Sequence, residues 1–279
     1  MNKILKNCPK TLMLVLFVFF IFGLTYLQSL SETGYSEKAF AADPDTKIDP
    51  RTFSILKEMT QFISIKNNYT FKAEIMFDVI SDSGQKLQVT GSEKVFLQKP
   101  DKVFIEYKGD YSAYKFLYNY NSVTLLDSTS NLYTQINAPE TINSTFDKLI
   151  KVYRFAPPLS DFFYLFPYKS LIENVVSSTY VGSSIVFGIR CHHLSFQEKD
   201  KDWQIWIEDG KRKIPRKVVI NYKNNPGSPQ FTAIILDWIL NESFSETLFN
   251  QNLTKNAAKS ETNLVYKEPG SNLGIIRNP

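Results

Sequence analysis

Residue types that carry out chemistry are scarce in this chain. Two cysteines and two histidines stand among 279 residues, and the formal net charge is only +4, from 32 basic and 28 acidic residues. Because basic and acidic residues are nearly equal in number, the chain lacks the excess of positive charge typical of nucleic-acid binders, and we expect no nucleic-acid partner. The 11 glycines and 13 prolines are too few for a collagen-like or low-complexity chain. Apolar residues make up 43% of the chain, with 22 Phe and 15 Tyr, which predicts a folded protein with a large core.

The first 41 residues have the pattern of an export signal. Lys3, Lys6 and Lys10 precede an uncharged, apolar run over 11–30, and Ala39-Phe40-Ala41 places small residues where a signal peptidase reads them. We therefore expect cleavage after Ala41. The spacer 28–38 is long, however, and an uncharged run of about 20 residues also suits an uncleaved membrane anchor. With either outcome, the preceding lysines predict that the bulk of the chain crosses the membrane.

Both histidines lie in one cluster, Cys191-His192-His193. Cys8 precedes the apolar run, so Cys191 is the single cysteine of the mature chain and no intramolecular disulfide can form there. Neighbouring residues of a strand point to opposite faces, so His192 does not easily join Cys191 and His193 at one metal or nucleophile. We expect structural roles for all three, and no catalytic residue, metal or cofactor. A hydrolase that uses Cys191 and His193 is the least favoured hypothesis.

Most of the mature chain alternates between apolar and polar residues with the period of a strand. Asp49-Pro50 and the apolar spacing after it predict an opening helix over 50–63. Two further helices are expected over 139–155 and 161–171. The remaining pattern indicates about eleven strands in one domain over 48–242. The expected strand segments are 69–79, 87–97, 103–107, 115–118, 123–127, 132–136, 175–181, 184–189, 193–197, 203–208, 214–222 and 231–240.

Two segments beside the strands have a distinct composition. The tail 243–279 is rich in Asn, Ser, Thr and Lys, with sparse apolar residues and no period, so we expect it to be disordered or loosely held. Around the turn near Asp200 and Asp202, carboxylates alternate with Lys199 and Lys201, a pattern typical of a solvated hairpin rim.

Two segments contain more apolar residues than a sheet with one solvated face needs. The segment Phe162–Tyr168 is apolar on all sides, and in 231–240 both alternating sets of residues are apolar, one containing Trp238 and the other Phe231. An antiparallel strand of this kind needs cover on both faces, or a ligand on one of them. The segment around 162–168 is therefore either a helix that completes the core or a lid over a hydrophobic cavity.

Several strings of the chain are distinctive. They are Arg190–Phe196, Asp202–Glu208, Ile214–Ile220, Pro229–Phe231 and Asp237-Trp238, with Asp49-Pro50 and Lys99–Val103 upstream. Together they resemble a family of predicted periplasmic proteins related to the lipoprotein carriers LolA and LolB. The resemblance covers about 48–242. It implies a periplasmic protein with a half-open antiparallel barrel of about eleven strands, whose mouth is plugged by helices and which has a cavity for lipid or lipoprotein acyl chains.

We therefore expect a mainly β (α+β) fold, a curved antiparallel half-barrel with helices on its concave face. The favoured function is non-enzymatic binding of a lipid or an acylated lipoprotein, with membrane contact that is transient or made through an uncleaved N-terminal segment. The alternative is an envelope interaction or sensory module that contacts an envelope protein and carries no lipid. The expected cavity residues are Phe71, Ile75, Phe77, Val103, Ile105, Trp203, Ile205 and Ile207, with Phe162, Phe163, Leu165 and Phe166 on the lid.

Overall fold

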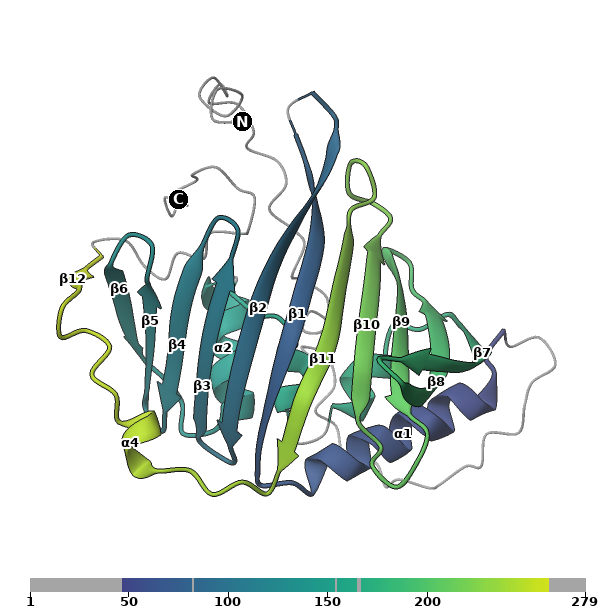
Figure 1. Ribbon diagram of the computed structural model, residues 1–279, viewed down its shortest axis with the longest axis horizontal. Helices are drawn as coiled ribbons and strands as arrows, with labels where there is room; N and C mark the ends of the chain where they lie inside the picture. The colour runs from purple at the N-terminus through teal and green to yellow at the C-terminus, as the bar shows by residue number, and fades with distance from the viewer. Residues whose placement is uncertain (1–46, 82, 154, 165–166, 261–279) are drawn as a thin grey trace, which may run out of the picture.

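A single twelve-stranded sheet organises the chain in the computed structural model, which describes residues 47–81, 83–153, 155–164 and 167–260. Helices α1 and α2 lie on one face of this sheet (Figure 1). The strands are β1 Asn68–Ile80, β2 Lys86–Gln98, β3 Lys102–Gly109, β4 Ala113–Asn119, β5 Ser122–Asp127, β6 Leu132–Asn137, β7 Ser177–Val186, β8 Ile189–Gln197, β9 Lys201–Glu208, β10 Pro215–Tyr222, β11 Gln230–Leu240 and β12 Ala258–Lys259. The helices are α1 Pro50–Ser64, α2 Ile142–Tyr153, the 3-10 turn η1 Ser160–Phe163, α3 Tyr168–Ile172 and α4 Glu246–Phe249.

The sheet is made of two meanders joined at its centre. Strands β1 to β6 follow one another in space, as do β7 to β11, and β1 pairs antiparallel with β11. Adjacent strands are antiparallel throughout, except that β12 runs parallel to β6. The sheet does not close, because β7 lies at one edge and β12 at the other. The expected mainly β, curved and open architecture is thus confirmed.

Helix α1 forms as its sequence predicts. The Asp49 side chain accepts a hydrogen bond from the backbone N–H of Arg51 at 3.0 Å, and Pro50 occupies the first turn, where its missing N–H costs nothing. Leu56, Met59 and Ile63 recur at three- and four-residue spacing and are fully buried. This apolar stripe packs the helix onto the half of the sheet formed by β7, β8 and β9.

The structure merges two expected strands into one. The segments 175–181 and 184–189 belong largely to the single strand β7, whose register shifts between Tyr180 and Gly182. Gly182, at φ +141°, absorbs a bulge rather than making a turn. The chain reverses instead at Phe187-Gly188, both at positive φ, which is the geometry of a two-residue hairpin.

The helical segments are shorter than expected. Helix α2 occupies 142–153 of the expected 139–155, and the expected helix over 161–171 divides into η1 and α3. Pro167 lies between them as the N-cap of α3, and a proline cannot continue a preceding helix. In addition, η1 is preceded by Leu159 in the left-handed conformation, at φ +59°.

The expected disorder of the tail is wrong for its first part. Residues 243–260 cross the outer face of the sheet, where α4 places Phe249 in contact with Phe104 and Leu117, and β12 then pairs with β6. The sequence does not predict this packing, because the apolar residues of the tail do not recur with the period of a helix or a strand. They fit a patch that only the assembled β3 and β4 provide. Residues 261–279 lie outside the described residues, as do 1–46 with the expected signal.

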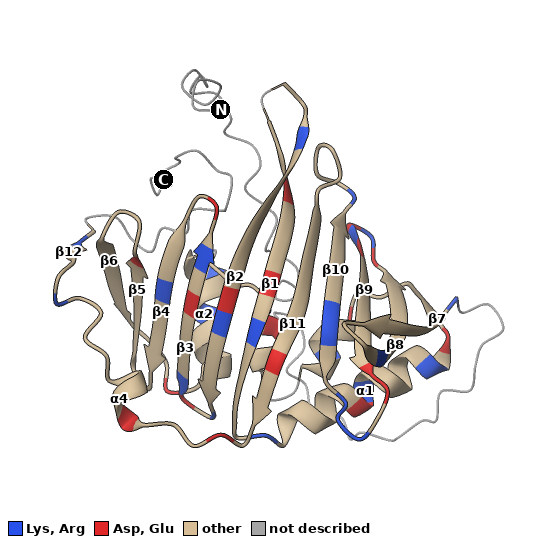
Figure 2. Ribbon diagram, viewed as in Figure 1, with Lys and Arg blue, Asp and Glu red and all other residues tan. Residues whose placement is uncertain are grey.

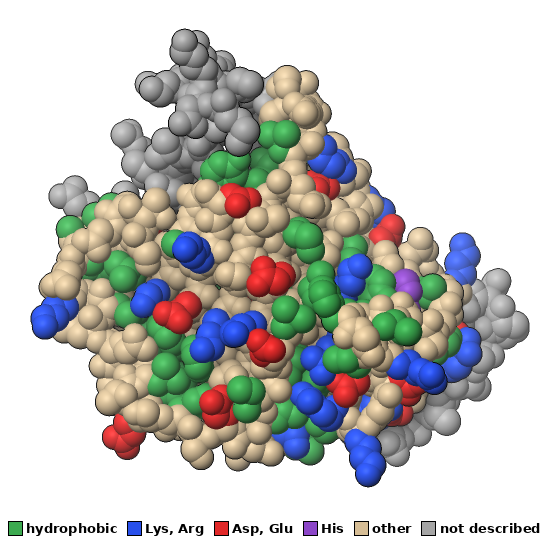
Figure 3. All heavy atoms as spheres, in the orientation of Figure 1, with side chains coloured by type: hydrophobic (Ala, Val, Ile, Leu, Met, Phe, Trp, Pro, Cys, Tyr) green, Lys and Arg blue, Asp and Glu red, His purple; other side chains and the backbone are tan. Residues whose placement is uncertain are grey.

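The two faces of the sheet differ in character. The inner face, which carries α1, α2 and η1, holds a continuous apolar cluster. The outer face carries Lys, Arg, Asp and Glu along the central strands (Figure 2), and Figure 3 shows both signs of charge interspersed over it. No helix within the described residues is long and apolar enough to span a bilayer.

Candidate functional site

The residues expected to line a cavity share the inner face. Nine of the ten described ones are buried with 4% exposure or less, and Phe77 is partly buried against them. Strand alternation explains this, because each strand contributes every second residue to one face. Leu165 and Phe166 lie outside the described residues. That this apolar face binds a lipid stays a prediction.

Trp238 joins the same face, against its expected parity. The register of β11 against β1 shifts near Asp237, a residue at φ +49°. The extra residue turns the Trp238 ring inward, 4.7 Å from the centre of the Phe71 ring, where its indole N–H donates to the Pro215 carbonyl at 3.1 Å. A bulge of this kind leaves no local signal in an alternating sequence. Strict strand alternation therefore placed Trp238 on the face opposite to that of Phe231.

The segment 155–164, here called the cover segment, crosses the inner face. Its Phe163 ring lies 6.4 Å from the Phe71 ring of β1 and 5.4 Å from the Phe146 ring of α2. The Tyr69 hydroxyl donates a hydrogen bond to the Phe162 carbonyl at 2.6 Å. Apolar contacts and few direct polar bonds therefore hold the cover segment on the sheet.

A buried ion pair lies beside the cover segment. Lys201 and Glu198 are 3.3 Å apart with side chains only 1% exposed, and the Trp203 indole N–H donates to Glu198 at 2.8 Å. Asp161 of η1 is electrostatically coupled to Lys201, while burial raises the pKa of Asp161 to about 7. Burial also raises the pKa of Glu198 and lowers that of Lys201.

The expected solvated rim is therefore wrong for Lys201. Its neighbours Lys199 and Asp200 retain exposure, whereas the Lys201 ammonium is enclosed with Glu198. A buried charge persists only when it is paired, which the hairpin achieves by placing the two residues three apart around its turn. The sequence signal that was available is the spacing Glu198-x-x-Lys201 itself.

The Cys191-His192-His193 cluster does not converge. The Cys191 thiol is buried against the Ile189 carbonyl, and burial raises its pKa to about 11. His192 lies between the Tyr180 hydroxyl at 3.1 Å and Asp209 at 3.2 Å, while His193 contacts Gln204 at 2.8 Å and stacks on Trp206. A protonated, enclosed thiol is a poor nucleophile. Over the described residues, no group of three His, Cys, Asp or Glu could hold a metal ion.

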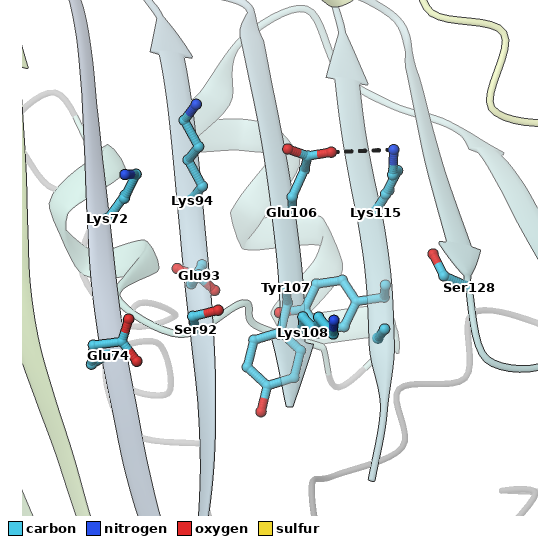
Figure 4. Close-up of a pocket in the computed structure, with 12 residues that line it drawn as sticks. Lys72, Glu74, Ser92, Glu93, Lys94, Glu106, Tyr107, Lys108, Lys115 and Ser128 are labelled. Carbon is cyan, nitrogen blue, oxygen red and sulfur yellow. Dashed lines mark ion pairs between the residues drawn. The ribbon is translucent and has the colours of Figure 1, made fainter. Parts of the chain in front are cut away.

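The outer face has a shallow, open depression of about 440 Å³. Register places Lys72, Lys94, Glu106 and Lys115 in one row across β1 to β4, and Figure 4 shows these side chains projecting from neighbouring strands. Glu106 and Lys115 form an ion pair at 3.2 Å with both side chains well exposed. Exposed pairs of this kind contribute little to stability or binding, so we interpret the depression as part of a solvated face.

The chain is similar to a protein family in sequence and to several solved structures. Residues 52–261 match the family described as predicted periplasmic protein (DUF2092). No curated protein matches the sequence. Similar solved structures include LprF from Mycobacterium bovis, at 11% identity over 69% of this chain and 94% of that one, with a TM-score of 0.42. The lipoprotein LppX from Mycobacterium tuberculosis is 10% identical over 71% of this chain and 98% of its own, with a TM-score of 0.39. A LolA superfamily protein from Nitrosomonas europaea is 8% identical over 72% of this chain and 98% of its own, with a TM-score of 0.34. Since the family match spans most of the described fold, the chain belongs to the DUF2092 family of predicted periplasmic proteins.

Proposed function

We propose that this protein binds the acyl chain of a lipid or lipoprotein between the inner face of the sheet and the cover segment. The observation that carries the proposal is the unequal cover of that face. Helix α1 packs one half of the sheet with a regular apolar stripe, whereas the other half meets α2 and the largely irregular segment 155–164. A cover held mainly by Phe contacts can exchange them for contacts with an acyl chain at little net cost.

The sheet supports this role because it is open. Its inner face presents Phe71, Val103 and Ile105 without closing into a barrel, so a ligand can enter without breaking strand pairs. The buried Lys201–Glu198 pair borders the cover segment, and the Lys201 ammonium attracts the Asp161 carboxylate through space when the cover is closed. The apolar surface then serves as a binding site of the concave, mostly apolar kind.

Native mass spectrometry tests the proposal. The protein is purified from the cell envelope without detergent, so that its intact mass also reports whether residues 1–41 are removed after Ala41. We expect a lipid-sized adduct whose occupancy falls in Phe163→Ala, with Phe249→Ala on the outer face as the matched control. A wild-type mass free of adducts, together with no uptake of fluorescent acyl probes, would refute the proposal.

A second candidate function, an envelope interaction module, is favoured by the free edge of the sheet. Strand β7 pairs only with β8 along most of its length, and its hairpin exposes Val181, Ile185 and Phe187 by 52%, 73% and 72%. An exposed apolar edge is suited to pairing with an extended segment of another protein. Crosslinking in the envelope should then capture a partner that Ile185→Lys loses, and this result without any lipid adduct would favour the module.

A further inference from the structure

A polar cluster lies within the apolar inner face, on strands β2, β3 and β4. Glu93 is 1% exposed, and neither of its carboxyl oxygens has a hydrogen-bond partner of normal geometry among the described residues. The Tyr107 hydroxyl is likewise buried without such a partner, and the Tyr114 hydroxyl interacts with the Glu93 carboxyl. Buried polar groups in native proteins are normally satisfied, so this cluster needs an explanation.

Strand register assembles the cluster. Glu93 lies opposite Tyr107, and Tyr107 lies opposite Tyr114, so the three side chains form one row across the sheet. The two tyrosine rings stack with centroids 4.9 Å apart and planes inclined by 16°. This stacking limits the freedom of both rings.

Two glycines complete the arrangement. Gly91 on β2 and Gly109 on β3 lie opposite each other. A Cβ atom added to Gly91 would lie 2.4 Å from the Tyr107 hydroxyl oxygen, and one added to Gly109 would lie 2.5 Å from the same oxygen. Any larger residue at either position would push the ring away from the sheet. The sequence therefore keeps space for Tyr107 in this one orientation, which is unexpected of a core position that only has to be filled.

The chemistry of the row indicates what it would bind. Burial raises the pKa of Glu93 well above its ordinary value, and the Tyr114 hydroxyl only partly opposes this. Burial also raises the pKa of Tyr107. A neutral Glu93 carboxyl and the Tyr107 phenol each carry a proton that they can donate, so the row favours a ligand oxygen that accepts hydrogen bonds. The next row toward the cover segment is purely apolar, with Phe71, Val95 and Ile105 side by side.

We propose that Glu93 and Tyr107 form an anchor that donates hydrogen bonds to the carbonyl oxygen of an esterified acyl chain, while the Tyr114 hydroxyl holds the Glu93 carboxyl in place. The chain itself lies on the adjacent apolar row. This inference rests on the proposed function and specifies the ligand as an acyl ester. A free fatty-acid anion is disfavoured because its charge would be desolvated beside a carboxyl, and an ammonium ligand would require Glu93 to ionise.

A pair of lipid probes tests the anchor. The probes are a fluorescent diacyl phospholipid and its ether-linked analogue, which has the same chains and headgroup but no carbonyl oxygens. Wild-type protein should bind the ester about five- to tenfold more tightly, the effect of one or two hydrogen bonds. Glu93→Met should reduce the ester preference, whereas Glu93→Gln, whose amide can still donate, should retain it. Tyr107→Phe should reduce it.

Controls separate this proposal from the function on which it rests. Glu74→Met changes a carboxylate on the outward side of β1 and should leave both affinities unchanged. Glu93→Met should also raise the thermal midpoint, because it removes an unsatisfied buried carboxyl, so loss of preference in it is not misfolding. Equal binding of ester and ether by wild-type protein would overturn the anchor alone, as would an ester preference that is undiminished in Glu93→Met. Failure to bind either probe would overturn the anchor and the proposed function together.

Discussion

Removing one ring from the cover segment should cost less stability than removing one from the sheet. Phe163 of η1 and Phe116 of β4 are both completely buried, and each contacts two aromatic rings. Substitution of a buried Phe by Ala normally costs about 3–5 kcal/mol. We expect this full loss for Phe116→Ala. For Phe163→Ala we expect less than about 2 kcal/mol, because the weakened cover leaves the sheet before the sheet unfolds and so caps the measured loss.

Urea denaturation followed by tryptophan fluorescence gives both free energies of unfolding. Binding of an apolar dye to the native state then shows whether the inner face has become accessible, and we expect dye binding in Phe163→Ala but not in Phe116→Ala. Equal losses of about 3–5 kcal/mol in the two variants, with no dye bound below the unfolding transition, would show that Phe163 is ordinary core and that segment 155–164 is no lid.

Four further changes test other parts of the structure. Gly91→Ala should lower the free energy of unfolding by about 1–3 kcal/mol in chemical denaturation, because the new methyl group meets the Tyr107 hydroxyl; an unchanged value would show that the ring is free to move. Asp161 has a folded-state pKa of about 7, so its contribution to stability is complete below about pH 4 and is lost as the pH rises through 7. Asp161→Asn should flatten that decline in thermal midpoints measured from pH 4 to 8, and an unaltered pH profile would contradict the assignment. Phe249→Ala should cost about 3 kcal/mol if the tail seals the outer face, and less than about 0.5 if it is only loosely held. Cys191→Ser should leave ligand binding unchanged, and iodoacetamide should modify the native thiol much more slowly than the unfolded one.

The family follows from short strings of the sequence, and most elements follow from their local pattern. The Asp49-Pro50 start of α1 and the alternation of β1 needed only neighbouring residues, since capping and strand parity act over a few positions. That is why ten of the twelve expected cavity residues can be placed together on the inner face. The sheet topology was accessible only through the resemblance, because no local pattern states that β1 pairs with β11.

Other features depend on contacts between distant parts of the chain. The bulges at Gly182 and Asp237 are set by pairing with neighbouring strands, and the second of them reverses the face of Trp238. Burial of Lys201 depends on the fold around its hairpin, and the position of Phe249 depends on a patch built from β3 and β4. The enclosure of Glu93 beside Tyr107 and Tyr114 is likewise visible only once three strands are assembled. The sequence by itself determined the periodicity, the start of α1 and the family, which follow from residues close together in the chain. Only the tertiary structure decided which polar groups are enclosed, because burial is a property of everything that packs around a residue.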